Sequence, residues 1–233
     1  MLNKKMMTSA VLLGMMSLGF AGQAFADEGD TKIIDGMKGE TSADVTTRGN
    51  LGKIDPTDPE TPLPEGDNRW IKVTLPTAVV FESDSTDAKK ITSSASNYEI
   101  KNESGRPVKV DVEKYAIDGG AGAKALSELN IKRGNGYIYD SSAKEISASE
   151  TSSVKLTKEK GVGNDAINQE FVRLANNKGE IGGITDADTT TKFEFTGTIE
   201  VGELEESQNF VESNLTFRFT ALRMDGKTVD EAK

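Results

Sequence analysis

The sequence predicts an all-β protein: an antiparallel β-sandwich of the Ig-like or Greek-key type, with one or two short helices in its loops and a disordered, proline-rich spacer before it. Three observations predict this fold. Apolar and polar residues alternate along several segments of the second half, which is the period-two pattern of half-buried strands. Residues 102–105 (NESG) are a turn signal between two such segments. Third, these segments lack the continuous apolar runs that parallel strands would need, so the strands are expected to be antiparallel.

The clearest strands are expected where the alternation is longest. Val108, Val110 and Val112 alternate with charged residues, and the same pattern runs through residues 192–201 and 215–222. Shorter expected strands are 70–75, 78–82, 97–102, 129–132, 137–140 and 153–157.

Two segments have helical spacing instead. Residues 123–129 follow a pair of glycines and are long enough for about two helical turns. Within residues 165–174, Ile167, Phe171 and Leu174 occupy positions i, i+4 and i+7 after an acidic cap. We therefore expect a short helix over each segment.

Residues 1–26 predict a secretory signal peptide. Lys4 and Lys5 form a positive start, residues 10–20 (AVLLGMMSLGF) form an apolar middle, and residues 24–26 (AFA) provide small side chains where a signal peptidase reads them. The apolar run is shorter than the ~20 residues of a membrane-spanning helix, and acidic residues follow it directly. We therefore expect cleavage after this triplet, export from a bacterial cell, and no membrane insertion of the mature chain.

Residues 27–68 predict an acidic, proline-rich, disordered spacer. The stretch has 11 acidic and 4 basic residues and few apolar side chains, which cannot offset the entropy of an ordered chain. Pro56, Pro59 and Pro62 recur every third residue, as in a polyproline II helix, so we expect a stiff stalk or a plain solvated linker there. The sandwich should then occupy residues 69–225, followed by a C-terminal tail over 226–233.

Composition excludes several kinds of chemistry. The 233 residues include neither Cys nor His, which rules out disulfides, thiolate and imidazole metal sites, a cysteine nucleophile and a Ser-His-Asp triad. The formal charge is -10, whereas a nucleic-acid binder needs a basic surface. We therefore expect a protein without a cofactor that does not bind nucleic acid.

Three short motifs match catalytic or metal-binding patterns. Residues 120–125 (GAGAKA) fit the G-x-G-x-x-A of dinucleotide sites, but no second βαβ strand follows, and a flexible loop is favoured. Ser-x-x-Lys at 141–144 and 152–155 occurs about as often as chance predicts for this composition. Asp186 and Asp188 could hold calcium through carboxylate oxygens, although a solvated loop is the favoured interpretation.

Trp70 is the chain's only tryptophan and the first candidate for contact with a ligand. Alternation places it on the face opposite Ile71 and Val73, where it could stack on a sugar ring of a wall polymer. It could equally pack at the edge of the core, which is the favoured interpretation.

Four stretches carry a resemblance. They are residues 70–81 (WIKVTLPTAVVF), 98–110 (YEIKNESGRPVKV), 195–199 (FTGTI) and 215–219 (LTFRF). Together they resemble secreted surface proteins of Gram-positive bacteria that are related to WxL-domain proteins. The resemblance implies a β-sandwich that attaches non-covalently to peptidoglycan and assembles with partner surface proteins.

The resemblance also adds two candidate contact residues. Phe217 and Phe219 stand where the family has the Trp and Leu of its Trp-x-Leu motif, which this chain lacks. The resemblance therefore implies contact with the wall at these positions. Their alternation with Thr216 and Arg218 suits core residues, and a core role is favoured.

We therefore expect a secreted, non-enzymatic protein that is retained non-covalently at the cell wall and acts in adhesion or in assembly of surface complexes. Its expected partners are peptidoglycan or another wall polymer and other surface proteins. Two alternatives stay open. One is a structural subunit that polymerises when an edge strand accepts a neighbour's extended segment. The other is a glycoside hydrolase that uses two of the many carboxylates.

Overall fold

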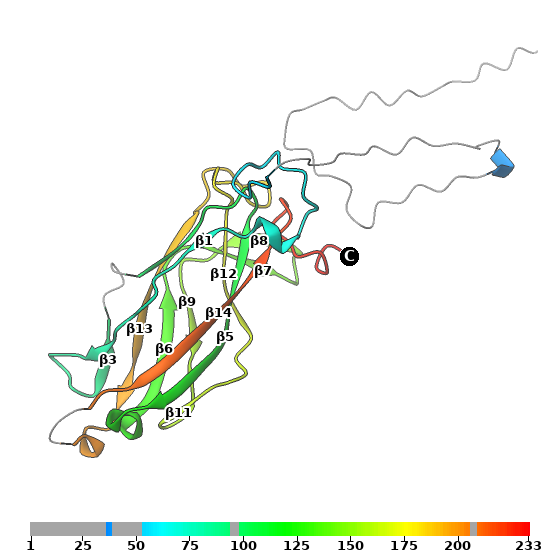
Figure 1. Ribbon diagram of the computed structural model, residues 1–233. Coiled ribbons are helices and arrows are strands. Elements are labelled where there is room, and N and C mark those ends of the chain that lie inside the picture. The colour runs from blue at the N-terminus through cyan, green and yellow to red at the C-terminus, as the bar shows by residue number, and fades with distance from the viewer. Residues whose placement is uncertain (1–35, 39–52, 94–97, 206–208) are drawn as a thin grey trace, which may run out of the picture.

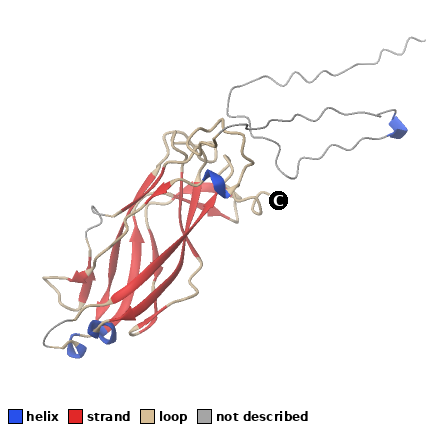
Figure 2. Ribbon diagram, viewed as in Figure 1, coloured by secondary structure: helices blue, strands red, loops and turns tan. Residues whose placement is uncertain are grey.

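The computed structural model describes residues 36–38, 53–93, 98–205 and 209–233. Two antiparallel sheets lie face to face and form one elongated body (Figure 1, Figure 2). The predicted fold class, an all-β antiparallel sandwich, is confirmed. The predicted signal peptide lies outside the described residues, as does the spacer before residue 53 apart from the 3₁₀ turn η1 (Gly36–Lys38).

The larger sheet is built around β13 (Thr190–Ile199), which pairs with β6 on one side and with β4 and then β3 on the other. β9 extends the sheet beyond β6, and β1 and β2 form its opposite border. Residues 75–81 run along this border between β1 and β2. The other strands of this sheet are β1 (Val73–Thr74), β2 (Glu82–Ser83), β3 (Lys90–Thr92), β4 (Glu99–Asn102), β6 (Leu126–Arg133) and β9 (Ser152–Lys155).

The smaller sheet has the order β14-β5-β12-β7-β8. β14 pairs with β5 along its whole length, and no other strand in the described part of the chain pairs with it. The strands of this sheet are β5 (Val108–Gly119), β7 (Tyr137–Asp140), β8 (Glu145–Ala148), β12 (Gln169–Leu174) and β14 (Glu212–Ala221).

Short elements complete the body. β10 (Thr157–Glu159) and β11 (Val162–Gly163) form a separate hairpin, and η2 (Asn68–Trp70), η3 (Ala121–Ala125) and η4 (Val201–Glu203) are 3₁₀ turns. No helix within the described ranges has the length and apolar character needed to span a membrane.

The core lies between the two sheets and follows the predicted alternation. The three valines of β5, at 108, 110 and 112, are fully buried, and Phe193 and Phe195 of β13 face them from the other sheet. Aromatic rings link the layers, because the Phe193 centroid lies 6.0 Å from that of Phe217 in β14. The long alternating segments therefore form the strands that the sequence predicts.

The helix predicted over residues 165–174 is wrong. Residues 169–174 form β12 instead, between β5 and β7 in the middle of the smaller sheet. A surface helix would leave one side polar and exposed, but Phe171, Val172, Arg173 and Leu174 are all buried. Consecutive buried residues suit a central strand that is covered on both faces, and this pairing overrides the local helical spacing.

The helix predicted over residues 123–129 is replaced by a tight turn. η3 ends at Ala125 and β6 begins at Leu126. Gly120 explains the turn, since its φ is +97° and a Cβ there would lie 2.2 Å from the Phe210 carbonyl oxygen. The glycine pattern of residues 120–125 therefore allows residues 209–211 to pack closely against η3.

The stalk predicted for residues 56–64 is also wrong, because residues 53–68 fold onto the end of the sandwich. Two successive β-turns begin at Asp55 and Asp58, each with proline as its second residue. Each aspartate also accepts a hydrogen bond from a backbone N–H two residues later, at 2.9 and 3.0 Å. The three-residue spacing of the prolines thus specifies consecutive turns, and the folded body begins before residue 69.

Candidate functional site

Trp70, the first candidate from the sequence, is buried rather than available at the surface. Its exposure is 0%, and it packs with Leu63 of the preceding segment. The indole Nε1 donates a hydrogen bond to the Pro64 carbonyl at 2.9 Å, and the Arg106 guanidinium lies 4.3 Å from the ring centroid. Trp70 ends a 3₁₀ turn beneath the folded residues 53–67, so it packs at the edge of the core, the role that the sequence favours, and is not free to stack on a sugar ring.

Phe217 and Phe219 are half-buried in β14 and pack against the core. The Phe217 ring centroid lies 6.0 Å from the ring centroids of both Phe171 and Phe193. The structure therefore gives both phenylalanines the core role that alternation favours. Phe217 also borders a surface hollow, described below.

Asp186 and Asp188 lie in the loop that precedes β13. Asp186 has a φ of +55°, and the Asp188 carbonyl accepts a hydrogen bond from the Ala175 N–H at 2.9 Å. Within the described residues, no group of three or more Asp, Glu, His or Cys side chains is placed to hold a metal ion.

A surface trough lined by both apolar and polar residues runs along the unpaired edge of β14. Two hollows of about 830 and 290 Å³ adjoin there, since their walls share Val79, Phe81, Ser213 and Asn214. One wall is the start of β14 and the other is the segment 75–83. We call this feature the β14 trough. Its remaining apolar lining includes Leu75, Ala78, Val80, Ile91, Leu126, Ile199, Leu204, Phe210, Val211, Leu215 and Phe217.

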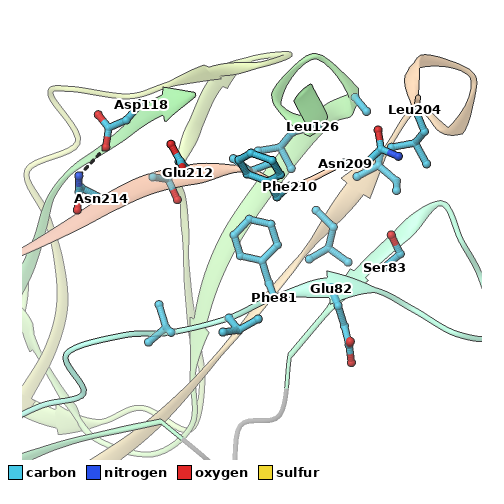
Figure 3. Close-up of a pocket in the computed structure, with 18 residues that line it drawn as sticks. Phe81, Glu82, Ser83, Asp118, Leu126, Leu204, Asn209, Phe210, Glu212 and Asn214 are labelled. Atoms are coloured by element: carbon cyan, nitrogen blue, oxygen red, sulfur yellow. Dashed lines mark hydrogen bonds between the residues drawn. The ribbon is translucent and has the colours of Figure 1, made fainter. Parts of the chain in front are cut away.

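Large apolar side chains occupy the centre of the larger hollow. Figure 3 shows the rings of Phe81 and Phe210 facing each other there, one from each wall. Phe210 is 51% exposed and Val80 is 68% exposed. Neighbouring exposed apolar residues beside a hollow are typical of a surface that binds another molecule.

The scaffold holds both walls in place. The Tyr98 hydroxyl accepts a hydrogen bond from the Val80 N–H at 2.8 Å and donates one to the Val80 carbonyl at 3.1 Å. On the other wall, the Phe210 carbonyl accepts a hydrogen bond from the Gly122 N–H at 3.0 Å. Val80 and Phe210 therefore both sit on anchored backbone, which favours a preformed site.

The larger hollow is acidic at its rim. Glu82, Asp118 and Glu212 line it, and no lysine or arginine of the described residues lines either hollow. The Asn214 side-chain amide donates a hydrogen bond to Asp118 at 2.5 Å (Figure 3). The Glu82 carboxylate points away from the paired rings in the same view. The rim thus offers negative charge without a local counter-charge.

A buried hydroxyl borders the smaller hollow. Tyr115 is 2% exposed and lies close to Ser213, yet its hydroxyl makes no hydrogen bond of ordinary geometry with the described residues. Burial raises the pKa of Tyr115, and the nearby Ser213 hydroxyl opposes this shift. The trough therefore contains a buried hydroxyl that has the Ser213 hydroxyl beside it but no hydrogen bond of ordinary geometry with the described residues.

Sequence reasoning missed this site. Phe81 lies in a predicted strand, but Phe210 belongs to no predicted element, and neither stands out as a candidate. Nothing in a local pattern identifies the strand at the edge of a sheet, because pairing depends on residues far apart in the chain. The position of Phe210, a large apolar residue just before an alternating strand, is the one signal that the sequence offers.

No protein-family model matches the chain, and comparison with curated proteins finds no similar sequence. Fold and site together define a class, an antiparallel β-sandwich in which an unpaired strand edge borders a surface trough. The relation to WxL-domain proteins stays a prediction that rests on the residues themselves.

Proposed function

We propose that this is an exported, non-enzymatic protein of the bacterial cell surface, retained non-covalently at the wall, that acts in adhesion or complex assembly by binding partner surface proteins. The observation that carries the proposal is the β14 trough, where a ten-residue strand has an unpaired edge beside exposed apolar side chains. Such an edge offers backbone donors and acceptors to an incoming strand, and adjacent pockets select its side chains.

Peptide binding suits the trough better than sugar hydrolysis. A glycoside hydrolase needs two carboxylates about 5–9 Å apart that face the scissile bond. Here Asp118 is engaged by Asn214, and Glu82 points away from the centre of the hollow. The centre itself is formed by Phe81 and Phe210, which suit the apolar side chains of a strand.

The test is co-sedimentation of the chain, expressed from residue 27 onward, with Gram-positive cell walls that keep their proteins and with protease-stripped walls. We expect binding to the protein-bearing walls and much less to the stripped ones. A variant with Val80→Asp and Phe210→Asp should bind about tenfold more weakly, because it places charge on the two most exposed large apolar residues of the trough.

Val162→Asp is the matched control, since Val162 is 41% exposed in β11 and lines neither hollow. It should bind like the unaltered chain. Equal binding to stripped walls, or full binding by the double variant, would contradict the proposal. Wall polymer would then be held by some other face.

The unpaired edge of β14 also favours a second candidate function, polymerisation by strand addition between copies. In that case, the chain should form oligomers whose size grows with concentration on size-exclusion chromatography. The double variant should stay monomeric. A monomer at all concentrations would leave only the first function.

A further inference from the structure

We infer that the β14 trough accepts an extended segment of about six residues from a partner protein, with apolar side chains at alternate positions and a lysine or arginine at its carboxyl end. The inference rests on the proposed function and specifies the chemistry of the partner.

The length follows from the wall that β14 provides. Its residues line the trough from Glu212 to Phe217. At ~3.4 Å per residue, this stretch spans about 17 Å, which matches about six residues of an added strand. Across the trough, residues 75–79 form no backbone hydrogen bond with any described residue. An incoming strand thus meets backbone groups available for pairing on both sides.

The apolar pattern follows from the alternation of side chains in a strand. Every second side chain of an added strand would point between the sheets, where Phe81, Phe195 and Phe217 form the lining. The intervening side chains would face solvent and can be polar. The Tyr115 hydroxyl, which makes no hydrogen bond of ordinary geometry with the described residues, can donate to a carbonyl of the added strand.

The charge and its position follow from the acidic rim. Glu82, Asp118 and Glu212 all line the larger hollow, and Glu212 is the first residue of β14. Antiparallel pairing, which is slightly more stable than parallel pairing, places the carboxyl end of an added strand beside the first residues of β14. A cation at that end would therefore lie near the carboxylates of Asp118 and Glu212, and no lysine or arginine of the described ranges lines either hollow to compete with it.

Three eight-residue peptides test the inference. The first is Thr-Val-Thr-Val-Thr-Val-Lys-Lys, the second ends in Glu-Glu instead, and the third carries Lys-Lys at its amino end. Affinity for the chain from residue 27 onward is measured by fluorescence anisotropy at low and high salt. We expect the first peptide to bind about tenfold more tightly than the second and severalfold more tightly than the third, with differences that shrink as salt rises.

Variants of the chain test which residues of the trough cause the preference for the peptide that ends in two lysines. Asp118→Asn combined with Glu212→Gln should abolish the preference for the first peptide and leave weaker, charge-independent binding. Glu145→Gln, at the other edge strand β8, is the matched control and should change nothing. Tyr115→Phe should weaken the binding of all three peptides severalfold, because the trough then lacks the hydroxyl that donates a hydrogen bond to a carbonyl of the bound strand.

The outcomes separate the inference from the proposed function. Equal affinity for all three peptides, or an unchanged preference in the double carboxylate variant, would overturn the inference and leave the proposed function standing. Failure of every peptide to bind, together with unaltered wall binding by the Val80→Asp, Phe210→Asp variant, would overturn both. Self-association that the first peptide cannot displace would place a second copy in the trough and overturn the inference.

Discussion

Arg173 lies fully buried on β12, and its guanidinium holds the end of the chain in place. It donates to Glu170 at 2.8 Å, to Glu231 at 2.6 Å and to the Gly226 carbonyl at 2.7 Å. Burial by itself lowers the pKa of Arg173, but the hydrogen bonds to Glu231 and Glu170 outweigh burial and raise it. The residues predicted to form a tail, 226–233, are therefore held against the smaller sheet.

The first prediction concerns the acid stability of this contact. Burial acts to raise the pKa of Glu231, but hydrogen bonds from Arg173 and Thr228 lower it from 4.5 to about 2. A folded-state pKa below the unfolded value gives stability that is fully present above pH 4.5 and is lost as pH falls toward 2. Glu231→Gln should lower the urea midpoint at pH 7 and flatten its decline over this range.

Asp230→Asn is the control for this titration, because the Asp230 side chain is 91% exposed. Its urea midpoints should follow those of the unaltered chain at every pH. An unchanged acid decline in Glu231→Gln would show that the Arg173 contact does not contribute.

The second prediction concerns Trp70. Truncation of this buried side chain removes its packing against Leu63 and its hydrogen bond to Pro64. Trp70→Ala should lower the free energy of unfolding by ~3–5 kcal/mol, the range for large buried aromatic residues. Urea unfolding followed by circular dichroism measures this. A change within ~0.5 kcal/mol, combined with lost wall binding, would instead indicate a surface contact.

At the scale of elements, the alternation of apolar and polar residues predicted those strands that bury one face in the core and leave the other face polar. The alternating valines of β5 and phenylalanines of β13 place one face in the core, so period two is visible in the sequence. β12 has no such contrast, because Arg173 is buried on the face opposite the core, where it pairs with Glu170 of the same strand and with the distant Glu231. Its assignment required the tertiary structure.

The segment 53–68 shows a different limit of sequence reasoning. Low hydrophobicity predicted disorder, yet a few residues suffice to attach the segment. Arg106 donates to Glu65 at 2.7 Å and to the Pro59 carbonyl at 3.1 Å, while Leu63 fills the space beside Trp70. The two hydrogen bonds of Arg106 join residues that are 41 and 47 positions apart, and composition alone cannot predict such contacts.

The third prediction concerns the turn before β6. Gly120→Ala should destabilise the chain by more than ~1 kcal/mol, because the new Cβ would overlap the Phe210 carbonyl at a backbone angle that favours glycine. Gly202→Ala is the control, since a Cβ at Gly202 meets nothing within 4 Å. Thermal unfolding of both variants measures the difference. Equal melting temperatures would contradict the packing of residues 209–211 on η3.

At the scale of the whole molecule, the two sides of the sandwich differ. Between β8 and β9, only residues 149–151 connect the smaller sheet to the larger one, and Arg133 binds the Ser149 carbonyl at 2.9 Å. On the other side, β14 and the border segment 75–81 face each other across the trough without a backbone hydrogen bond between them. The open side is therefore a property of topology, which no single segment of sequence encodes.

This asymmetry explains which features of the structure could be predicted from the sequence. It predicted the sandwich and a core position for Phe217, because both depend on local alternation. It did not predict the trough, because Phe81 and Phe210 lie more than 120 positions apart and meet only when the two sheets pack. The candidate site is thus the part of the molecule that depends most on long-range pairing.

Amide hydrogen exchange along the two outer strands of the smaller sheet tests the central claim most directly. The chain is compared with and without a saturating amount of the peptide that ends in two lysines. If β14 accepts a strand, exchange should slow at residues 212–217 and stay unchanged in β8. Unaltered exchange throughout β14, or equal slowing in β8, would contradict strand addition at this edge.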